Sequence, residues 1–441
     1  MTVENTGRAD DAARHIREQQ AAEHIHGICL KTGPPRRVGV ELEWLVRDAR
    51  DPALPVPAER IAAAVSAFGA AAGGGDADAL PSSSAPGVLP SGAALTSEPG
   101  GQLELSSLPA DSLADCVRST AADLAALRAA VADAGLELAG VGLDPFRLPR
   151  RILRLPRYAA MEAFFDRGGP WGRQMMCATA SVQVCLDAGE DTDGCRGYRA
   201  RWLLLHAIGP VLVSAFANSP LRAGRPTGWR SSRQQVWARM DPGRTRPPRL
   251  TGDPRANWAA YALDAQVMCV REDDSADWSA PPGLTLRDWV RGAPIEGGLR
   301  PPTIEDLDYH LSTLFPPVRP RGHFELRMID AQPGDGWVVP AAVASGLLSD
   351  ARAGDAAMAA AEPLWHGLDH SDAGPWATAA RCGPANLLLA RASRECFAAA
   401  RGALARQQPN APILAAVDAF IDQYVSKDRC PADDLLEDAG R

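Results

Sequence analysis

Residues 95–106 hold the side chains of this chain that are best suited to chemistry. Glu98, Gln102 and Glu104 interrupt an apolar strand pattern, and a Pro99-Gly100-Gly101 turn places one acid on each side of it. Carboxylates beside apolar strand residues lose hydration, so another group must compensate for that loss. Bound cations would provide the compensation.

Two further acidic segments have the same character. Glu41 and Glu43 alternate with apolar residues in Val-Gly-Val-Glu-Leu-Glu-Trp at 38–44, and Glu325 does so in His-Phe-Glu-Leu-Arg at 323–327. Alternation places the acids on one strand face and the apolar residues on the other. One such strand alone is usually the solvent side of a half-exposed antiparallel sheet. Three of them, one carrying the unusual Glu-Pro-Gly-Gly-Gln turn, favour convergence on a site for divalent cations.

The surrounding elements must hold these acids in place. Strands are predicted at about 37–46, 136–143 and 175–186, and the last contains Gln183, whose simplest interpretation is a hydrogen-bonded core amide. Helices are predicted over 11–30, over 57–72 with Pro57 as the first helical residue, over 110–134 and from 156 onward. Residues 73–93 and 271–300 are expected to be loops. Alanine-rich helices follow residue 340 to about 426, and the acidic end is expected to fray.

The composition excludes several classes of protein. A chain of 441 residues with an apolar fraction of 46% can bury a large core. Its net charge of −8 and pI near 5.6 argue against a general nucleic-acid binder. Lysine occurs only at 31 and 427, which excludes a phosphate loop of the GxxxxGK type.

Cysteine usage and hydropathy indicate the compartment. The 9 cysteines are scattered without CxxC pairs, as is typical of reduced cytosolic thiols rather than disulfides or a zinc site. The N-terminus lacks the apolar segment of a signal peptide. The most apolar run, 202–217, contains His206 and Pro210 and is too short to span a membrane. We therefore expect a soluble cytoplasmic protein without membrane or nucleic-acid partners; no feature predicts an oligomeric state.

Arginines are dense between residues 224 and 256, in loops with Gly and Pro. The members of this group are Arg225, Arg230, Arg233, Arg239, Arg244, Arg246, Arg249 and Arg255. They form either a solvated face or a local positive site for anionic substrates, and the sequence favours the two interpretations equally.

Eight short motifs then occur in one order between about 36 and 335. They lie at 38–43, 98–104, 175–184, 215–220 (Ala-Phe-Ala-Asn-Ser-Pro), 233–237 (Arg-Gln-Gln-Val-Trp), 261–264 (Tyr-Ala-Leu-Asp), 310–319 and 324–327. In this order they resemble the plant-type glutamate–cysteine ligase family, and most closely its actinobacterial ergothioneine-pathway branch.

This resemblance implies an α+β fold like the catalytic domain of glutamine synthetase. A curved, mainly antiparallel sheet would form a funnel with flanking helices, and a helical C-terminal region would pack on the same domain. The implied division is a catalytic region over 1–340 and the helical region over 341–441. The implied reaction joins L-glutamate and L-cysteine: ATP, the co-substrate, phosphorylates the γ-carboxylate, and the amine displaces phosphate to give γ-glutamylcysteine.

The resemblance also implies roles for individual residues. Two or three Mg²⁺ ions would be held by oxygen ligands, which hard cations prefer. One ion would take Glu41, Glu104 and Glu325, and another Glu43, Glu98 and Gln183, with Glu104 able to bridge. Arg327 and Glu104 would be catalytic. The implied substrate-binding residues are Arg233, Gln102, Trp237, Tyr261 and Asp264. The family has Arg-Ser-His where this chain has Arg233-Gln234-Gln235, so only the arginine carries over.

Two alternatives remain beside this function. A related carboxylate–amine ligase would use the same chemistry with another amine acceptor, and a catalytically silent homologue would only bind metabolites. The full set of acids together with Arg327 argues against the silent homologue, because such a chain usually loses a ligand. Whether γ-glutamylcysteine would serve ergothioneine or glutathione synthesis is not determined by the motifs.

Overall fold

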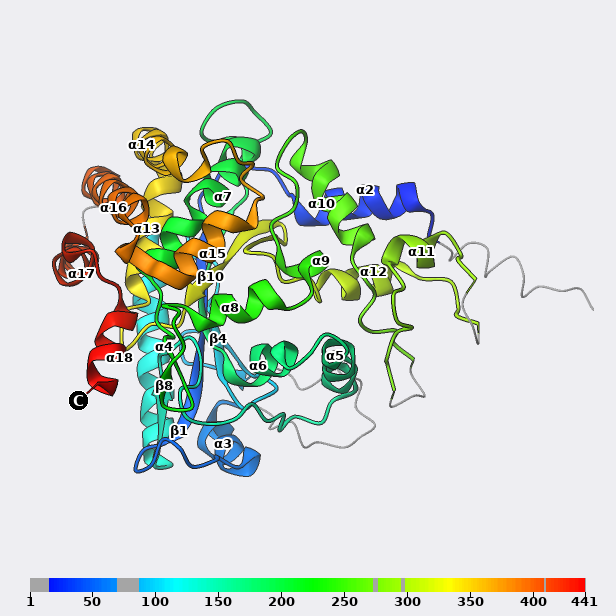
Figure 1. Cartoon of the computed structure of the whole chain (residues 1–441), viewed down its shortest axis with the longest axis horizontal. Helices are drawn as coiled ribbons and strands as arrows, with labels where there is room; N and C mark the ends of the chain where they lie inside the picture. Colours follow the sequence, from blue (N-terminus) through cyan, green and yellow to red (C-terminus); the bar gives the residue numbers. More distant parts are fainter. Residues whose placement is uncertain (1–15, 70–86, 273–276, 295–297, 408–409, 441) are drawn as a thin grey trace, which may run out of the picture.

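A computed structural model describes residues 16–69, 87–272, 277–294, 298–407 and 410–440. Within them the chain alternates strands and helices up to residue 330 and is helical afterwards (Figure 1). The strands are β1 (Val38–Asp48), β2 (Gly87–Val88), β3 (Ala94–Ser97), β4 (Leu103–Ser106), β5 (Leu136–Ala139), β6 (Ser181–Asp187), β7 (Leu221–Arg222), β8 (Arg225–Pro226), β9 (Val318–Pro320) and β10 (His323–Asp330).

The helices of the first 330 residues connect these strands. They are α2 (Glu18–Cys29), α3 (Ala58–Val65), α4 (Leu113–Asp133), α5 (Pro156–Asp166), α6 (Trp171–Ala178), α7 (Tyr198–Ala215), α8 (Ser232–Arg239), α9 (Pro242–Thr245), α10 (Pro254–Asp264), α11 (Leu286–Val290) and α12 (Ile304–Leu311). The later helices are α13 (Val338–Ser349), α14 (Ala351–Ala361), α15 (Ala373–Cys382), α16 (Leu387–Gln407), α17 (Ala411–Gln423) and α18 (Pro431–Ala439).

One antiparallel sheet organises the molecule. Its strand order is β2-β3-β4-β1-β6-β10-β9, and β5 pairs with the second half of β1. The register aligns the acids that the sequence singled out: Glu43 lies opposite Glu104, and Glu41 lies opposite Gln183. Because cross-strand partners share a face, these side chains lie together on one side of the sheet. The predicted α+β class and mainly antiparallel sheet are confirmed.

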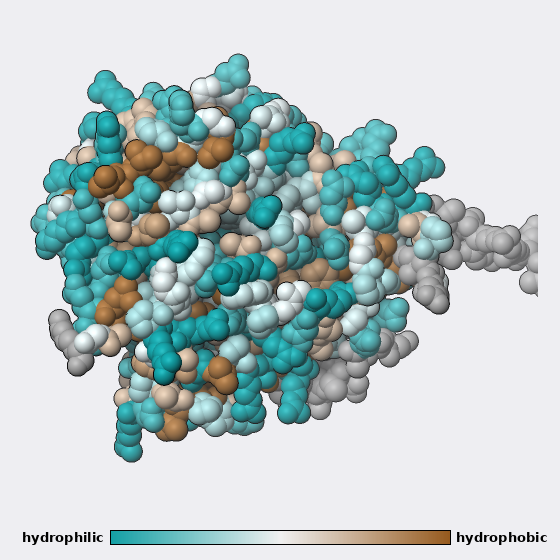
Figure 2. Space-filling model, viewed as in Figure 1, coloured by the Kyte–Doolittle hydropathy of each residue, from teal (hydrophilic) through white to brown (hydrophobic). Residues whose placement is uncertain are grey.

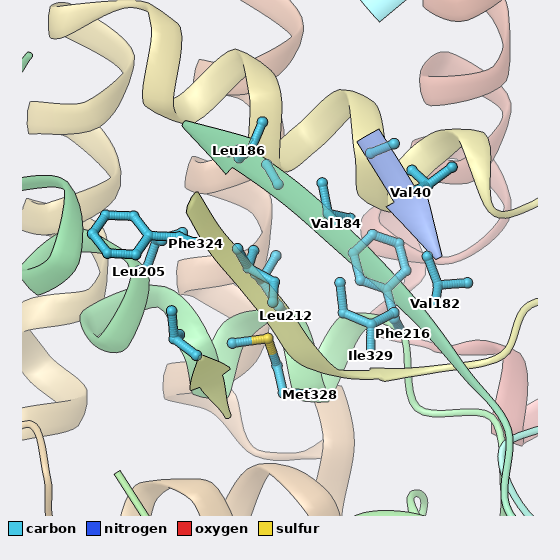
Figure 3. Close-up of a cluster of buried hydrophobic side chains, with 14 of the residues drawn as sticks. Val40, Val182, Val184, Leu186, Leu205, Leu212, Phe216, Phe324, Met328 and Ile329 are labelled. Atoms are coloured by element: carbon cyan, nitrogen blue, oxygen red, sulfur yellow. The ribbon is translucent and has the colours of Figure 1, made fainter. Parts of the chain in front are cut away.

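The opposite face of the sheet is apolar and forms the main core. Figure 3 shows side chains of β6 and β10, among them Val184 and Phe324, packed with Leu205 and Phe216 from the α7 segment. Helices α4, α7 and α13 cover this face, with the remaining C-terminal helices outside them (Figure 1). The apolar run at 202–217 is therefore largely the buried helix α7. Burial of this face stabilises the sheet and leaves the acidic face free for function.

The molecular surface is mostly hydrophilic on the face that Figure 2 shows, with hydrophobic residues in separate patches. In the described part of the chain, no helix combines the length and the apolar character needed to cross a membrane.

Several predicted boundaries differ from the structure. The stretch predicted as one strand from 175 is helix α6 up to Ala178, and β6 begins only at Ser181. Short apolar runs fit a buried helix as well as a strand, which is why periodicity failed there. Strand β5 ends at Ala139 rather than 143: a side chain at Gly140 would come within 2.1 Å of the Gln332 carbonyl oxygen, and that close approach ends the pairing.

The chain ends differ as well. The first helix begins at Glu18, and its predicted start at 11 lies outside the described residues. Pro57 is the N-cap of α3 rather than its first residue, and the helix ends at Val65; residues 70–72 lie outside the described part. The acidic end, expected to fray, is helix α18 instead.

Helix α18 is ordered because it has tertiary partners. The Ala432 N–H donates to the Ala217 carbonyl oxygen at 2.9 Å, and Arg230 forms an ion pair with Asp433 at 2.8 Å. The fully buried Cys430 completes this contact. Charge alone would have favoured a solvated tail, and the apolar contacts outweigh it. The predicted division at residue 340 stays a prediction; helix α13 runs across it.

Candidate active site

A cavity of about 1390 Å³ opens over the acidic face of the sheet. The strands form its floor, and residues of α5, α6, α8 and α12 form its walls. Its acidic lining residues are Glu41, Glu43, Glu98, Glu104, Glu272 and Asp306. Its basic lining residues are Arg157, Arg233, Arg271, Arg300, Arg319, Arg321 and Arg327. Such a lining suits substrates and ions that carry charge of both signs.

The turn that carries Glu98 is shaped by its glycines. A Cβ at Gly100 would lie 2.2 Å from the Cys177 carbonyl oxygen, so only glycine lets the turn approach the end of α6 this closely. Gly101 has φ of +86°, which favours glycine. The Glu98 N–H and the Gln102 carbonyl oxygen close the turn at 2.8 Å. The motif therefore places Glu98 in the lining of the cavity.

Burial and mutual repulsion act on the clustered glutamates. Desolvation, with a smaller contribution from Glu325, raises the pKa of Glu41 to about 7. Desolvation, followed by the charge of Glu43, raises the pKa of Glu98 to about 7. The pKa of Glu104 is raised well above its usual value by desolvation and then by the charges of Glu41, Glu98 and Glu43. This cluster needs protons or cations to be stable.

The donor chemistry of the cluster fits a hard divalent cation. Its carboxylates and the Gln183 amide are all oxygen ligands, which Mg²⁺ prefers. Within the described residues, no three His, Cys, Asp or Glu side chains are arranged so that they could hold one ion. The carboxylates would therefore have to draw closer around a bound ion, and their excess negative charge favours that movement.

Glu325 has a different environment from the other predicted ligands. It is fully buried, and Arg319 donates to both of its oxygens at 2.8 to 3.2 Å. Arg327 also contacts it. Burial raises the pKa of Glu325, but the neighbouring arginines outweigh this and hold the pKa below its usual value. A metal role for Glu325 would require it to share its carboxylate with these arginines.

Gln183 connects the acidic and basic parts of the cavity. Its Nε2 donates to Glu43 Oε1 at 3.0 Å, and its Oε1 accepts from Arg327 Nη1. The core-amide interpretation is therefore correct about its hydrogen bonding, and its metal role stays a prediction for a residue that lines the cavity. Arg327 Nε is buried and has no hydrogen-bond partner within the described part of the chain.

Arg233 has a guanidinium with unused donors. The side chain is 1% exposed and lines the cavity, stacked over the Trp237 ring at 4.4 Å. Its Nη2 donates to the Arg327 carbonyl oxygen at 2.8 Å. Its Nε and Nη1 have no hydrogen-bond partner among the described residues. A buried arginine with two open donors is suited to hold a carboxylate.

A stack of arginines and tyrosine forms another wall, which the sequence did not predict. The Tyr309 ring has Arg157 and Arg271 each at 4.9 Å from its centroid, and Arg157 donates to Ser312 Oγ at 3.0 Å. Tyr158 lines the same region. These residues come from α5, α12 and a predicted loop, so no local pattern could have brought them together.

Comparison with known proteins identifies the family of the chain. A model of the glutamate–cysteine ligase family 2 matches residues 37–440. The chain belongs to this family. The match extends beyond the motif region at 36–335 and includes the C-terminal helices. The chain is 39% identical over 422 residues to the glutamate–cysteine ligase EgtA of Mycobacterium tuberculosis, covering 95% of this chain and 89% of that protein.

More distant relatives agree with this placement. A chloroplastic glutamate–cysteine ligase of Medicago truncatula is 33% identical over 244 residues, covering 54% of this chain and 46% of that protein. The solved glutamate–cysteine ligase of Francisella tularensis, in complex with AMP, has a TM-score of 0.50 at 12% identity, covering 92% of this chain and 85% of that one. At that identity the likeness concerns the fold alone.

Membership of the family does not place every predicted residue in the cavity. Tyr261 is not part of the lining: its ring stacks on that of Trp258, also on α10, with the ring centroids 5.2 Å apart. Asp264 is also outside the lining and pairs with Arg287 at 2.6 Å at the surface. Neither residue therefore lines the cavity, and their substrate-binding roles stay predictions.

The structure also shows what Gln102 and the arginines of 224–256 contact. Gln102 lines the cavity, but its Nε2 donates to the carbonyl oxygens of Met176 and Thr179, so the amide mainly ties the turn to α6. Among the arginines of 224–256, Arg233 alone lines this cavity. Arg244 is fully buried and bonds to backbone oxygens instead. That segment is therefore not a uniform solvated face, and the main cavity receives only the Arg233 guanidinium from it.

Proposed function

We propose that the chain ligates the γ-carboxylate of L-glutamate to the amine of L-cysteine at the expense of ATP, giving γ-glutamylcysteine. Following its actinobacterial resemblance, we assign the product to ergothioneine biosynthesis. The observation that supports this best is a single cavity in which a repelling glutamate cluster faces Arg233 and Arg327. Carboxylate activation needs both features, because the reaction brings an anionic nucleophile to an anionic phosphoryl group.

Arg233 is the residue that binds the glutamate substrate. Its Nη2 gives one hydrogen to the Arg327 carbonyl oxygen, and the second Nη2 hydrogen, together with the free Nε or Nη1, forms the fork that a carboxylate accepts bidentately. Trp237 beneath the guanidinium limits its rotation. The bond from Nη2 to the Arg327 backbone sets its direction. Fixed in this way, Arg233 orients the substrate at little entropic cost during the reaction.

The phosphoryl transfer takes place between the acids and Arg327. An oxygen of the γ-carboxylate attacks the terminal phosphorus of ATP, and ADP leaves. Magnesium, when bound, would neutralise charge on the phosphates. The residues that would hold the ions are Glu41, Glu43, Glu98, Glu104, Gln183 and Glu325. Arg327 lines the cavity with an open Nε and stabilises the charge that develops on the transferred group.

The second step forms the amide bond. The amine of cysteine attacks the acyl carbon of γ-glutamyl phosphate, the bond to the phosphate oxygen breaks, and the amine gives up a proton. The walls beside Tyr158 and Tyr309 would enclose the acceptor and keep water from the acyl phosphate.

The test is ADP release by the purified chain with glutamate, MgATP and a panel of amines. ADP should appear only when divalent metal, glutamate and acceptor are all present, with cysteine as the best acceptor. The product mass should match γ-glutamylcysteine. If another amine reacts better than cysteine by about tenfold, a difference of about 1.4 kcal/mol in the barrier, the acceptor assignment is wrong and the related ligase takes its place. Binding without ADP release under any condition would favour the silent homologue.

A further inference from the structure

The motif Ala-Phe-Ala-Asn-Ser-Pro at 215–220 has no role in the chemistry above, yet it lies against a buried carboxylate. Asp330, the last residue of β10, is 1% exposed. Its Oδ2 accepts the Asn218 N–H at 2.9 Å and the Ser219 hydroxyl at 2.7 Å, and its Oδ1 accepts the Ser231 hydroxyl at 3.0 Å. Asp330 is thus a buried acceptor for groups from two other segments.

Both serines connect Asp330 to helix α8 through hydrogen bonds. Ser219 Oγ accepts the backbone N–H of Arg233 at 3.1 Å, and Ser231 Oγ accepts that of Gln234 at 3.1 Å. An ionised carboxylate can only accept, so each hydroxyl hydrogen must point to Asp330. The hydroxyl lone pairs then face the first turn of α8, whose N–H groups lack partners inside the helix. Asp330 therefore fixes the backbone from which the Arg233 side chain extends.

The same carboxylate also acts on the Arg233 side chain. Asp330 Oδ1 lies 3.9 Å from Arg233 Nη1, close enough to offset part of its charge and too far for a hydrogen bond. Arg233 thereby stays stable in a buried position while Nε and Nη1 remain without partners in the described structure. A carboxylate in hydrogen-bond contact would have used one of the donors that a substrate needs.

We propose that Asp330, acting through Ser219 and Ser231, is the positioning residue that holds Arg233 ready for the substrate carboxylate. The inference rests on the proposed function, since it assumes that Arg233 binds glutamate. Space for the anchor comes from Gly142, where a Cβ would lie 2.5 Å from the Asp330 carboxyl carbon. Asparagine at 330 would direct amide hydrogens at groups that are themselves donors, so the same shape would not preserve the relay.

The chain offers a matched control for a buried aspartate without this role. Asp123 is also 1% exposed and accepts the backbone N–H groups of Ser91 and Ala93, at 2.5 and 3.2 Å. It stabilises the turn between β2 and β3 and is absent from the cavity lining. Asp123→Asn should lower the melting temperature while leaving the KM for glutamate unchanged.

The first experiment is steady-state kinetics of Asp330→Asn. We expect the KM for glutamate to rise by about tenfold or more, with the KM for ATP changed by less than about twofold. The stabilisation of the protein by glutamate alone, measured as a thermal shift, should weaken in parallel. Equal changes in both KM values, or none in that for glutamate, would make Asp330 a structural residue and overturn the proposal.

A double-mutant cycle with Arg233→Lys shows whether Asp330 acts through Arg233. If it does, the double variant should have a KM for glutamate within about twofold of Arg233→Lys alone. Effects that multiply would mean independent roles and overturn the proposal. Should Asp330→Asn fail to fold, Ser219→Ala and Ser231→Ala each remove one relay bond. Each should raise the KM for glutamate by about threefold or more, and an unchanged value in both would be decisive against the relay.

The failure of this inference differs from a failure of the ligase function. If the wild-type protein binds glutamate but releases no ADP, the ligase function fails, and the thermal shift still reports the effect of Asp330 on binding. If wild type is active and Asp330→Asn keeps its KM for glutamate, only the positioning role fails.

Discussion

Replacing Glu104 by Gln tests the acidic cluster most directly. The change keeps the size of the side chain and removes the ionisation of a carboxyl that lies directly opposite Glu43 on β1. Opposed side chains on neighbouring strands have Cβ atoms about 5 Å apart. Two charges at about that distance repel by about 3 kcal/mol at an effective dielectric constant near 20. Proton uptake relieves part of this, so we expect a stability gain of about 1–3 kcal/mol in metal-free protein at alkaline pH.

The pH dependence follows from the direction of the pKa shifts. Burial and neighbouring acids raise the pKa of Glu104 in the folded protein, so folding favours its protonated form. Stability from this group is fully present below its unfolded pKa near 4.5 and is lost as pH rises through the folded value. Gln cannot lose it. The gain of Glu104→Gln should therefore be absent below about pH 4 and grow as pH rises toward about pH 9.

The assay combines melting curves with ADP release. For a chain of 441 residues, 1 kcal/mol corresponds to about 1 °C in melting temperature, so a shift of about 1–3 °C is expected in chelator at high pH. Magnesium should stabilise wild type more than the variant, and turnover should fall by about 100-fold or more, a loss of about 2.7 kcal/mol. Glu137→Gln is the matched control: it is an exposed strand glutamate, expected to change stability by at most about 0.5 kcal/mol and leave the rate unchanged.

The result that would refute this reasoning is near wild-type turnover in Glu104→Gln. It would remove Glu104 from the metal set and from catalysis. If the difference in melting temperature between Glu104→Gln and wild type does not change with pH, the glutamates of the cluster are solvated and do not repel one another.

The remaining predictions concern the arginines and the residues placed outside the cavity. Arg233→Lys should raise the KM for glutamate by about tenfold to 100-fold with little change for ATP, because lysine cannot form the bidentate contact; equal effects in kinetics would move Arg233 out of the glutamate site. Arg319→Met should lower the unfolding free energy by about 3–5 kcal/mol in denaturant titrations, because Glu325 keeps a buried charge without its main partner; a loss below about 1 kcal/mol would contradict this. Tyr261→Phe and Asp264→Asn should leave the KM for cysteine within about twofold of wild type, since neither residue lines the cavity, and a larger rise would restore the predicted contact.

The strand face was predictable because alternation is a local property. Glu41, Glu43 and Glu104 repeat with period two among apolar neighbours, and that pattern alone places them on one face of a sheet. Strands β4, β1, β6 and β10 then pair so that their apolar faces all lie on the side of one shared core. The prediction therefore covered what a strand determines on its own, and the family motifs added Arg233.

The parts that were not predicted depend on contacts between distant segments. Arg157 and Tyr309 meet only because the fold brings α5 next to α12 in one wall of the cavity, and neither helix carries a pattern that shows this. Arg319 was not singled out because its partner Glu325 was assigned to metal. Tyr261 was assigned to substrate binding from a motif alone, and a shared motif does not show that its ring stacks on Trp258 outside the cavity lining.

The order of the strands explains how the acids of β1 and β4 stay apart from the arginines of β9 and β10 within one cavity. The acids lie on β1, β4 and the turn before it, whereas Arg319 and Arg327 lie on β9 and β10, at the other side of the sheet. Strand β6 lies between them and contributes Gln183, whose amide donates to Glu43 and accepts from Arg327. A charged residue at that position could satisfy only one of these neighbours. A neutral donor and acceptor at the boundary lets these acids remain available for cations while Arg327 keeps its Nε open for phosphate groups.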